Sequence, residues 1–353
     1  MKTIGNGQRL EEKRRFGLDV GDATHSDEVA KERSKIVVPP SFSVVICAYT
    51  EDRWDDLRRA VASVQRQTLP AVETIVVIDH NPELFVRSRR ELPEAVGIQN
   101  EGRRGLSGAR NTGVAAARGE VVAFLDDDAL AEPDWLERLA EPYTDERVLG
   151  VGGEIIPDWA AGRPRYFPAE FHWVVGCTYA GLPEERRPIR NLIGANMSIR
   201  RDILTEVGGF SSVIGRVGTN PVGCEETELC IRARQRWPGA EFIYEPNARV
   251  HHSIPKVRAR WRYFAARCWS EGLSKAVVAR IAGTRDGLSS ERSHALKTLP
   301  LGVLRGLRDA VRGDPGGLAR ATAIMAGLLV TTCGYLFGVI RGIQDVGKLR
   351  DDA

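Results

Sequence analysis

Cysteine is scarce in this sequence, and its spacing excludes two kinds of protein. The 353 residues contain six cysteines, and no two of them form a CxxC pair. No set of cysteines and histidines has the spacing of a zinc finger, and six cysteines are too few for a disulfide framework in a chain of this length. We therefore expect free thiols in a reducing cytosol.

An excess of charge of one sign is also missing. Lys and Arg total 50 against 47 Asp and Glu, so the formal net charge is only +3. A dedicated nucleic-acid-binding protein carries a marked basic excess, and we expect no nucleic-acid partner. Residues 1–40 are polar and charged and lack the apolar segment of a signal peptide. We interpret them as a partly disordered leader.

What the sequence does contain is an alternation of apolar strands and amphipathic helices. Residues 42–49, 74–78 and 121–125 are runs rich in Val and Ile, and residues 55–67 and 107–118 have helical spacing. Strands that are apolar throughout are buried on both faces. The pattern predicts an α/β fold with a mostly parallel sheet and helices on both sides.

Polar residues follow three of these strands. They are Tyr49 to Glu51, Asp79, and Asp126 to Asp128. Because the carboxyl ends of parallel strands meet at one edge of a sheet, where the ligand crevice lies, these residues are the first candidates for function.

The acidic run Asp126-Asp127-Asp128 is the strongest motif. Carboxylates at a strand end can hold Mg²⁺ or Mn²⁺, which prefer oxygen ligands and pair with substrate phosphates. The alternative is that the acids only begin the following helix, where negative charge is favourable. His251 or His252, after a predicted strand at 248–250, is a further candidate ligand, although a histidine more often has a structural role.

Two other segments carry candidate catalytic or binding groups. Glu225 and Glu226 open a predicted helix that continues to Arg236, and a carboxylate there could remove a proton from a hydroxyl. A solvated acidic first turn is the alternative. Arg110 lies in a Gly/Ser-rich segment that is neither a dinucleotide fingerprint nor a P-loop, and it could bind a phosphate or pair with an acid at the edge of the core.

With these motifs in place, the chain resembles inverting family-2 glycosyltransferases of the GT-A fold. The matching segments are 44–68, 73–80, 105–137, 191–204 and 223–234, in the order that the family has. Residues 250–276 are similar to actinobacterial members called glucosyl-dolichyl-phosphate glucuronosyltransferases. Processive relatives carry QxxRW, whereas this chain has Val257 at the Gln position, which favours transfer of a single sugar.

The resemblance implies a role for each matching residue. The donor is a nucleotide-diphospho-sugar, such as a UDP-sugar, and the acceptor is a lipid-linked or other glycan. The donor-binding residues would be Ala48, Tyr49, Glu51, Asp79, Arg110, Asp126 and Asp127; the metal ligands would be Asp126, Asp128 and His251. Glu226 aligns with the family's catalytic Asp, with Glu225 as the alternative base, and Asn196 and Trp173 would lie on the acceptor side.

The carboxyl-terminal part contains a long segment without charged residues. The mean hydropathy of −0.25 excludes a protein with many spans, but residues 321–340 contain no charged side chain. Twenty helical residues reach about 30 Å, the thickness of the hydrocarbon core. We expect a glycosyltransferase domain at 41–255 and a helical region at 256–353 that binds the cytoplasmic face of the plasma membrane, either peripherally or through one span.

Two other functions fit the same sequence features. A nucleotidyltransferase that makes an activated sugar can share such a sheet and acidic metal site, and it needs no membrane segment. A non-catalytic, membrane-bound nucleotide-sugar-binding protein is the second alternative. A complete acidic run together with Glu226 argues against it.

Overall fold

The computed structural model describes residues 38–212, 214–216, 223–283 and 287–341. Most of the predicted leader at 1–40 lies outside these residues. The chain from Pro39 onward forms one compact unit. The described carboxyl-terminal helices therefore belong to the same unit as the α/β body.

The first half of the chain forms the parallel part of the sheet. Its strands are β1 (Phe42–Ala48), β2 (Glu73–Asp79), β3 (Val96–Asn100) and β4 (Val121–Asp126). They lie in the order β3-β2-β1-β4, and every pairing among them is parallel. The predicted strands and their direction are confirmed, because long runs of β-branched residues favour buried central strands.

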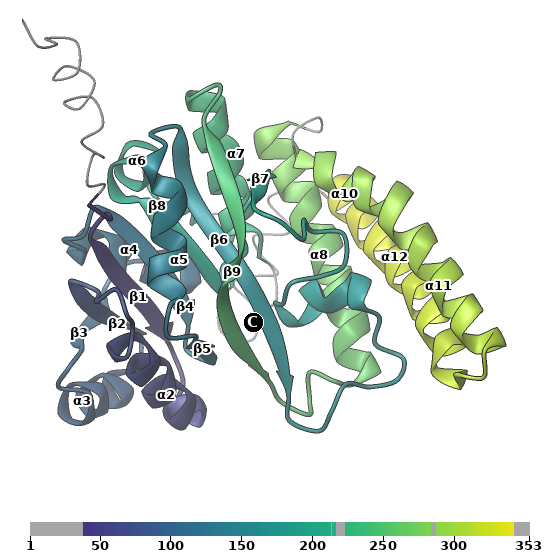
Figure 1. Cartoon of the computed structure of the whole chain (residues 1–353), viewed down its shortest axis with the longest axis horizontal. Coiled ribbons are helices and arrows are strands. Elements are labelled where there is room, and N and C mark those ends of the chain that lie inside the picture. Colours follow the sequence, from purple (N-terminus) through teal and green to yellow (C-terminus); the bar gives the residue numbers. More distant parts are fainter. Residues whose placement is uncertain (1–37, 213, 217–222, 284–286, 342–353) are drawn as a thin grey trace, which may run out of the picture. The chain divides into compact units, whose positions relative to one another are not determined.

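The second half of the chain extends this sheet with mixed pairings. Its strands are β5 (Ala129–Ala131), β6 (Val148–Trp159), β7 (Arg187–Ile189), β8 (Asn196–Arg200) and β9 (Glu241–Ile254). β8 is antiparallel to β4 and to β6, whereas β9 is parallel to β6 and pairs antiparallel with both β5 and β7. Figure 1 shows the long strands β6 and β9 side by side in the middle of the molecule.

Helices cover both faces of the sheet, as predicted. One core contains Val44 and Ile46 of β1 together with Leu57, and the other contains Val45 with Ala109 and Leu229. Successive side chains of β1 therefore pack into the cores on opposite faces of the sheet. The covering helices include α2 (Trp54–Gln65), α3 (Pro82–Glu91), α4 (Leu106–Ala116), α5 (Trp135–Ala140), α6 (Arg201–Glu206) and α7 (Glu225–Arg236). Three short 3-10 segments also occur: η1 (Glu51–Arg53), η2 (Glu141–Thr144) and η3 (Ala169–Val175).

The carboxyl-terminal region forms a layer of helices beside the sheet (Figure 1). It comprises α8 (Trp261–Ala282), α10 (Ser289–Ser293), η4 (His294–Thr298), α11 (Leu299–Val311) and α12 (Pro315–Arg341). α12 packs along both α8 and α11, and α8 also contacts α7. Within the described residues, α12 is the one helix long and apolar enough to cross a membrane, and it contains the predicted segment 321–340.

Candidate active site

The acidic run lies where β4 ends, at the edge of the sheet that the sequence predicts. Asp128 is buried, and its carboxylate lies 2.9 Å from Nε2 of His252. Asp126, Asp128 and His252 each offer a ligand atom, and these atoms all lie within 4.8 Å of one another. Two carboxylates and an imidazole suit a divalent cation such as Mn²⁺ or Mg²⁺.

The pKa values of Asp127 and Asp128 are shifted in opposite directions. Burial raises the pKa of Asp127 to about 7, and the charge of Asp128 adds to this rise. Burial also acts to raise the pKa of Asp128, but His252 and the neighbouring guanidinium groups outweigh it and hold that pKa well below its usual range. The nearest of these are Arg53 Nη1 at 3.2 Å and Arg258 Nη2 at 3.3 Å from Asp128. The guanidinium groups of Arg53 and Arg258 therefore place positive charge next to the acidic run.

The histidine prediction needs correction. The resemblance implies His251 as a metal ligand, but the structure groups His252 with Asp126 and Asp128. His251 is partly exposed, and its Nε2 lies 3.0 Å from Glu132 instead. Successive side chains of a strand point to opposite faces, so only one residue of the pair on β9 can face Asp128.

Arg110 connects the acidic run to the start of α7. Its Nη1 donates to Glu225 Oε1 over 2.9 Å, and its Nη2 lies 3.7 Å from Asp126 Oδ1. Nη2 also donates to the carbonyl oxygen of Gly194, where a Cβ atom would lie 2.5 Å from that nitrogen. Glycine is therefore required at 194 for the guanidinium to reach this position. Arg110 thus pairs with buried Glu225, and its donor-binding role stays a prediction.

Glu226 differs from its neighbours on α7. Glu225 is buried against Arg110, and Glu228 is buried in an ion pair with Arg232 at 2.8 Å. Glu226 is half-buried, lines a cavity and forms no ion pair with another described residue. Burial, together with the charge of Glu225, raises the pKa of Glu226 to about 7. A carboxylate with such a pKa is suited to proton transfer near neutral pH.

The backbone at the start of α7 is strained. Cys224, which precedes the helix, has a φ of 76°, in the left-handed region that non-glycine residues rarely adopt. Its Sγ donates to Glu271 Oε1 of α8 at 3.4 Å. Strain of this kind persists only where surrounding contacts hold it, and it is common at functional sites.

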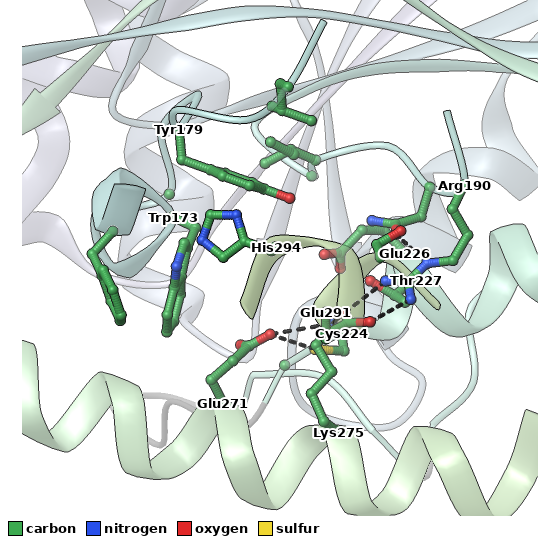
Figure 2. A pocket seen from close by; sticks show the side chains of 18 of the residues that line it. Trp173, Tyr179, Arg190, Cys224, Glu226, Thr227, Glu271, Lys275, Glu291 and His294 are labelled. Atoms are coloured by element: carbon green, nitrogen blue, oxygen red, sulfur yellow. Dashed lines mark hydrogen bonds and ion pairs between the residues drawn. The ribbon is translucent and has the colours of Figure 1, made fainter. Parts of the chain in front are cut away.

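These groups surround one cavity of about 640 Å³. Figure 2 shows Trp173, Tyr179 and His294 gathered on one side of the view, with Glu226 and Arg190 on the other. The residues that line the cavity include Arg110, Asp126, Trp173, Tyr179, Arg190, Glu225, Glu226, His252, Arg258, Tyr263, Lys275, Glu291, His294 and Tyr335. The carboxyl-terminal helices thus supply part of the wall of the site.

A buried ion cluster in this wall was not anticipated from the sequence. Lys275 Nζ lies 2.9 Å from Glu291 and 3.2 Å from Glu271, and Arg190 also pairs with Glu291 at 2.5 Å (Figure 2). The sequence holds one signal for it: Glu271 and Lys275 are oppositely charged side chains at i and i+4 of one helix. Their partners come from distant segments, which the sequence does not bring together.

The predicted donor residues on β1 and β2 lie together at the neighbouring strand ends, outside the lining of the cavity. Ala48 pairs with Ile78, and the carbonyl oxygen of Tyr49 accepts from Asn81. Asp79 fixes the local loop by accepting from Asn100 and from the backbone N–H of Gly105. Glu51 pairs with Arg87 on the surface, at 3.4 Å.

Arg53 links this edge to the acidic run. Its guanidinium carbon lies 5.8 Å from the centre of the Tyr49 ring, and its Nη1 donates to Asp127 over 2.9 Å. Among the remaining predicted donor residues, Tyr49 thus shares the Arg53 side chain with Asp127.

The two predicted acceptor-side residues have different positions. Trp173 lines the cavity. Asn196 does not, because it is fully buried and all of its polar atoms are used. Its Oδ1 accepts from the indole of Trp135, and its Nδ2 donates to the carbonyl oxygens of Glu154 and Ala248. Asn196 ties β6, β8 and β9 together, and its acceptor-side role stays a prediction.

Comparison with known proteins gives the site its context. Residues 43–208 match the family model of Glycosyl transferase family 2. The glucosyl-dolichyl phosphate glucuronosyltransferase of Haloferax volcanii is 36% identical over 306 residues, which cover 85% of this chain and 96% of that protein. The chain belongs to glycosyltransferase family 2. The predicted enzyme class is confirmed, which sets aside the nucleotidyltransferase and the non-catalytic binding protein.

Two further proteins are similar to the chain at lower identity. The succinoglycan biosynthesis protein ExoM of Rhizobium meliloti is 25% identical over 265 residues, which cover 72% of this chain and 77% of that protein. Among solved structures, the mannosyltransferase of Pyrobaculum calidifontis in complex with GDP-Man and Mn²⁺ aligns with a TM-score of 0.52. It is 16% identical and covers 87% of this chain and 92% of its own. The GT-A fold predicted from the sequence is confirmed.

Proposed function

We propose that this glycosyltransferase moves one sugar from a nucleotide-diphospho-sugar, with a UDP-sugar as the first candidate, to a hydroxyl group of a lipid-linked acceptor. The observation that carries the proposal is the shared cavity, which holds both the metal-ligating group at Asp126 and the free carboxylate of Glu226. The name of the Haloferax relative supports a glucosyl-dolichyl phosphate acceptor. The Pyrobaculum structure, with GDP-Man and Mn²⁺, supports a nucleotide-sugar donor and a metal.

The donor diphosphate would bind at the acidic edge of the sheet. Asp126, Asp128 and His252 fit a Mn²⁺ or Mg²⁺ ion by their chemistry and their proximity. A bound divalent cation offsets the negative charge that develops on the leaving diphosphate. Arg258, which lines the cavity 3.3 Å from Asp128, would add a second positive charge there. We assign the nucleoside to the edge formed by Ala48, Tyr49, Glu51 and Asp79.

Glu226 would remove the proton from the acceptor hydroxyl. The hydroxyl oxygen forms a bond to the anomeric carbon while the bond from that carbon to the diphosphate oxygen breaks. The nucleoside diphosphate leaves, the proton remains on Glu226, and the configuration at the anomeric carbon is inverted. A positioned base contributes about 10²–10⁴-fold to such a rate. Arg110, by neutralising Glu225, keeps the second carboxylate from competing for this proton.

The acceptor sugar would lie against Trp173 and Tyr179, whose rings line the cavity. Aromatic rings offer an apolar surface to the C–H face of a sugar. A lipid-linked acceptor is confined to a bilayer, so we assign the protein to the cytoplasmic face of the plasma membrane, where nucleotide sugars are available.

A nucleotide-sugar panel tests the donor. Binding to the folded state raises the melting temperature, so the correct donor with Mn²⁺ should shift it, whereas the same donor with EDTA should not. The donor found in this way is then incubated with a glucosyl polyprenyl phosphate, and release of nucleoside diphosphate is measured. If no nucleotide sugar shifts the melting temperature, or none is turned over with any lipid-linked sugar, the proposal is wrong.

A further inference from the structure

One face of α12 carries a stripe of exposed apolar side chains. Its members follow one another at intervals of seven, four, seven and four residues, which places them on one side of a helix. They are Leu318, Met325, Leu329, Leu336 and Ile340. Each is between 54% and 84% exposed. At 1.5 Å per residue the stripe is about 33 Å long.

The opposite face of α12 is fixed to the body of the protein. A Cβ atom at Gly334 would lie 2.3 Å from the carbonyl oxygen of Trp269 on α8, and one at Gly338 would lie 2.8 Å from the Cβ of Ala276. Further along α12, a Cβ at Gly327 would lie 2.5 Å from the ring of Phe171. The GxxxG spacing of Gly334 and Gly338 therefore serves contact with α8, and α12 lies against the body over most of its length.

α11, which packs along α12, carries exposed apolar and positively charged side chains. Leu304, Leu307 and Val311 are exposed and lie on one face by their spacing of three and four residues. Arg305, Arg308 and Arg312 repeat the same spacing one position later, so they form a parallel row next to the leucines. Within the described residues, Arg308 and Arg312 form no ion pair. An apolar row beside a row of arginines is the pattern of a helix that lies in the headgroup region of an anionic membrane.

The stripe adjoins the active-site cavity. Leu328, Thr331, Thr332 and Tyr335 of α12 line the cavity, and Leu328 and Thr332 are at the same time exposed to solvent. These two residues lie between the cavity-lining face and the stripe on the same helix. A surface that covers the stripe would therefore meet the side of the cavity at Leu328 and Thr332.

We propose that α11 and α12 form a docking surface for an anionic lipid bilayer, with α12 parallel to the membrane plane and not across it. To span the bilayer, α12 would have to separate from α8 or draw α8 into the hydrocarbon core with it. α8 carries the charged side chains of Glu271 and Lys275, and burying charged side chains in hydrocarbon costs free energy. The lipid of an acceptor would leave the cavity past Leu328 and Thr332 directly into the bilayer. The path of the acceptor lipid rests on the proposed function, whereas docking to the bilayer does not.

Vesicle binding by matched variants tests the surface. Leu329 is 64% exposed on the stripe, and Val86 of α3 is 62% exposed on the body, so Leu329→Glu and Val86→Glu introduce the same charge at equal exposure. We expect Leu329→Glu to weaken binding to vesicles of phosphatidylcholine with 30% phosphatidylglycerol by at least tenfold, and Val86→Glu to leave it unchanged. Arg308→Glu/Arg312→Glu should weaken binding to these vesicles but not to pure phosphatidylcholine. Equal binding by Leu329→Glu and the wild type would overturn the proposal.

Two further measurements separate docking from spanning and from activity. With protein added to preformed vesicles, an added protease should remove a tag placed after the last residue completely; protection of the tag would show a span. Transfer to a short-chain, water-soluble acceptor should be equal in Leu329→Glu and the wild type. If no variant and no wild type transfers sugar while vesicle binding follows the prediction, the proposed function fails and the docking surface stands.

Discussion

Nη1 of Arg110 lies 2.9 Å from Oε1 of Glu225, and both side chains are buried. This ion pair distinguishes two adjacent glutamates that the sequence leaves equivalent. Glu225 is held by a cation at the core, with its second oxygen lacking a hydrogen-bond partner among the described residues. Glu226 turns toward the cavity with its carboxylate free of ion pairs to described residues.

Glu226→Gln should lower the rate of sugar transfer by about 10²–10⁴-fold, because an amide cannot accept the proton of the hydroxyl. Donor affinity, measured by titration calorimetry with Mn²⁺, should stay within twofold of the wild type. Glu225→Gln provides the comparison: it should lower the melting temperature by removing the nearer of the two acidic partners of buried Arg110, and reduce the rate less. Full turnover by Glu226→Gln would transfer the role to Glu225.

The rate at saturating substrate should rise with pH and level off above about 7. The pKa of Glu226 is raised to about 7 by burial and by the charge of Glu225, so the carboxylate is protonated and inactive as a base below that pH. The pH profile of kcat tests this directly. Asp127, whose pKa is also about 7, could produce the same inflection. The residual rate of Glu226→Gln separates the two, since it should show no inflection if Glu226 is the group that titrates.

His252→Asn should weaken Mn²⁺ binding by more than the roughly 10–100-fold that is typical for loss of a group that only orients a metal ligand, because His252 itself offers a ligand atom. His251→Asn is the matched control, because it changes the same residue type one position away on the opposite face of β9 and removes only a surface contact with Glu132. Titration calorimetry or electron paramagnetic resonance of free Mn²⁺ measures both variants without turnover. Stronger loss in His251→Asn would restore the original sequence prediction.

Glu291→Gln should lower the free energy of unfolding at pH 7 by about 2–3 kcal/mol, because it leaves Lys275 and Arg190 without their shared partner in a largely buried cluster. Burial opposes ionisation of Glu291, but Lys275 and Arg190 lower its pKa to about 2. The stabilisation is therefore present above the unfolded pKa of about 4.3 and is lost as pH falls toward 2. Urea titrations at pH 7, 5 and 3.5 should show the difference from the wild type shrinking.

Glu206→Gln is the control for this cluster. Its ion pair with Arg236 is of similar length, 3.2 Å, but both side chains are more than half exposed. Exposed pairs contribute about 0–1 kcal/mol, so this variant should unfold like the wild type. If Glu291→Gln and Glu206→Gln lower the free energy of unfolding equally, the ion cluster around Lys275 contributes no more to stability than an exposed ion pair does.

The sequence by itself determined the parallel half of the sheet and the position of Asp126 to Asp128. The strands β1, β2 and β4 are continuous runs of Val, Ile and other apolar residues, and such runs are local information that needs no knowledge of distant partners. The acids follow β4 directly, so their place at the carboxyl edge follows from the strand itself. The start of α7 at Glu225 is equally local.

Only the tertiary structure distinguished the two members of each neighbouring pair, His251 and His252, and Glu225 and Glu226. The choice of His252 over His251 depends on the phase of β9, which is set by its pairing with β5 and by a register shift against β6 between Gly153 and Glu154. The choice of Glu226 over Glu225 depends on Arg110, more than a hundred residues away. The role of α12 as a wall of the cavity depends on its contact with α8. Each of these outcomes depends on contacts between segments that are far apart in the sequence, so local residue patterns do not predict them.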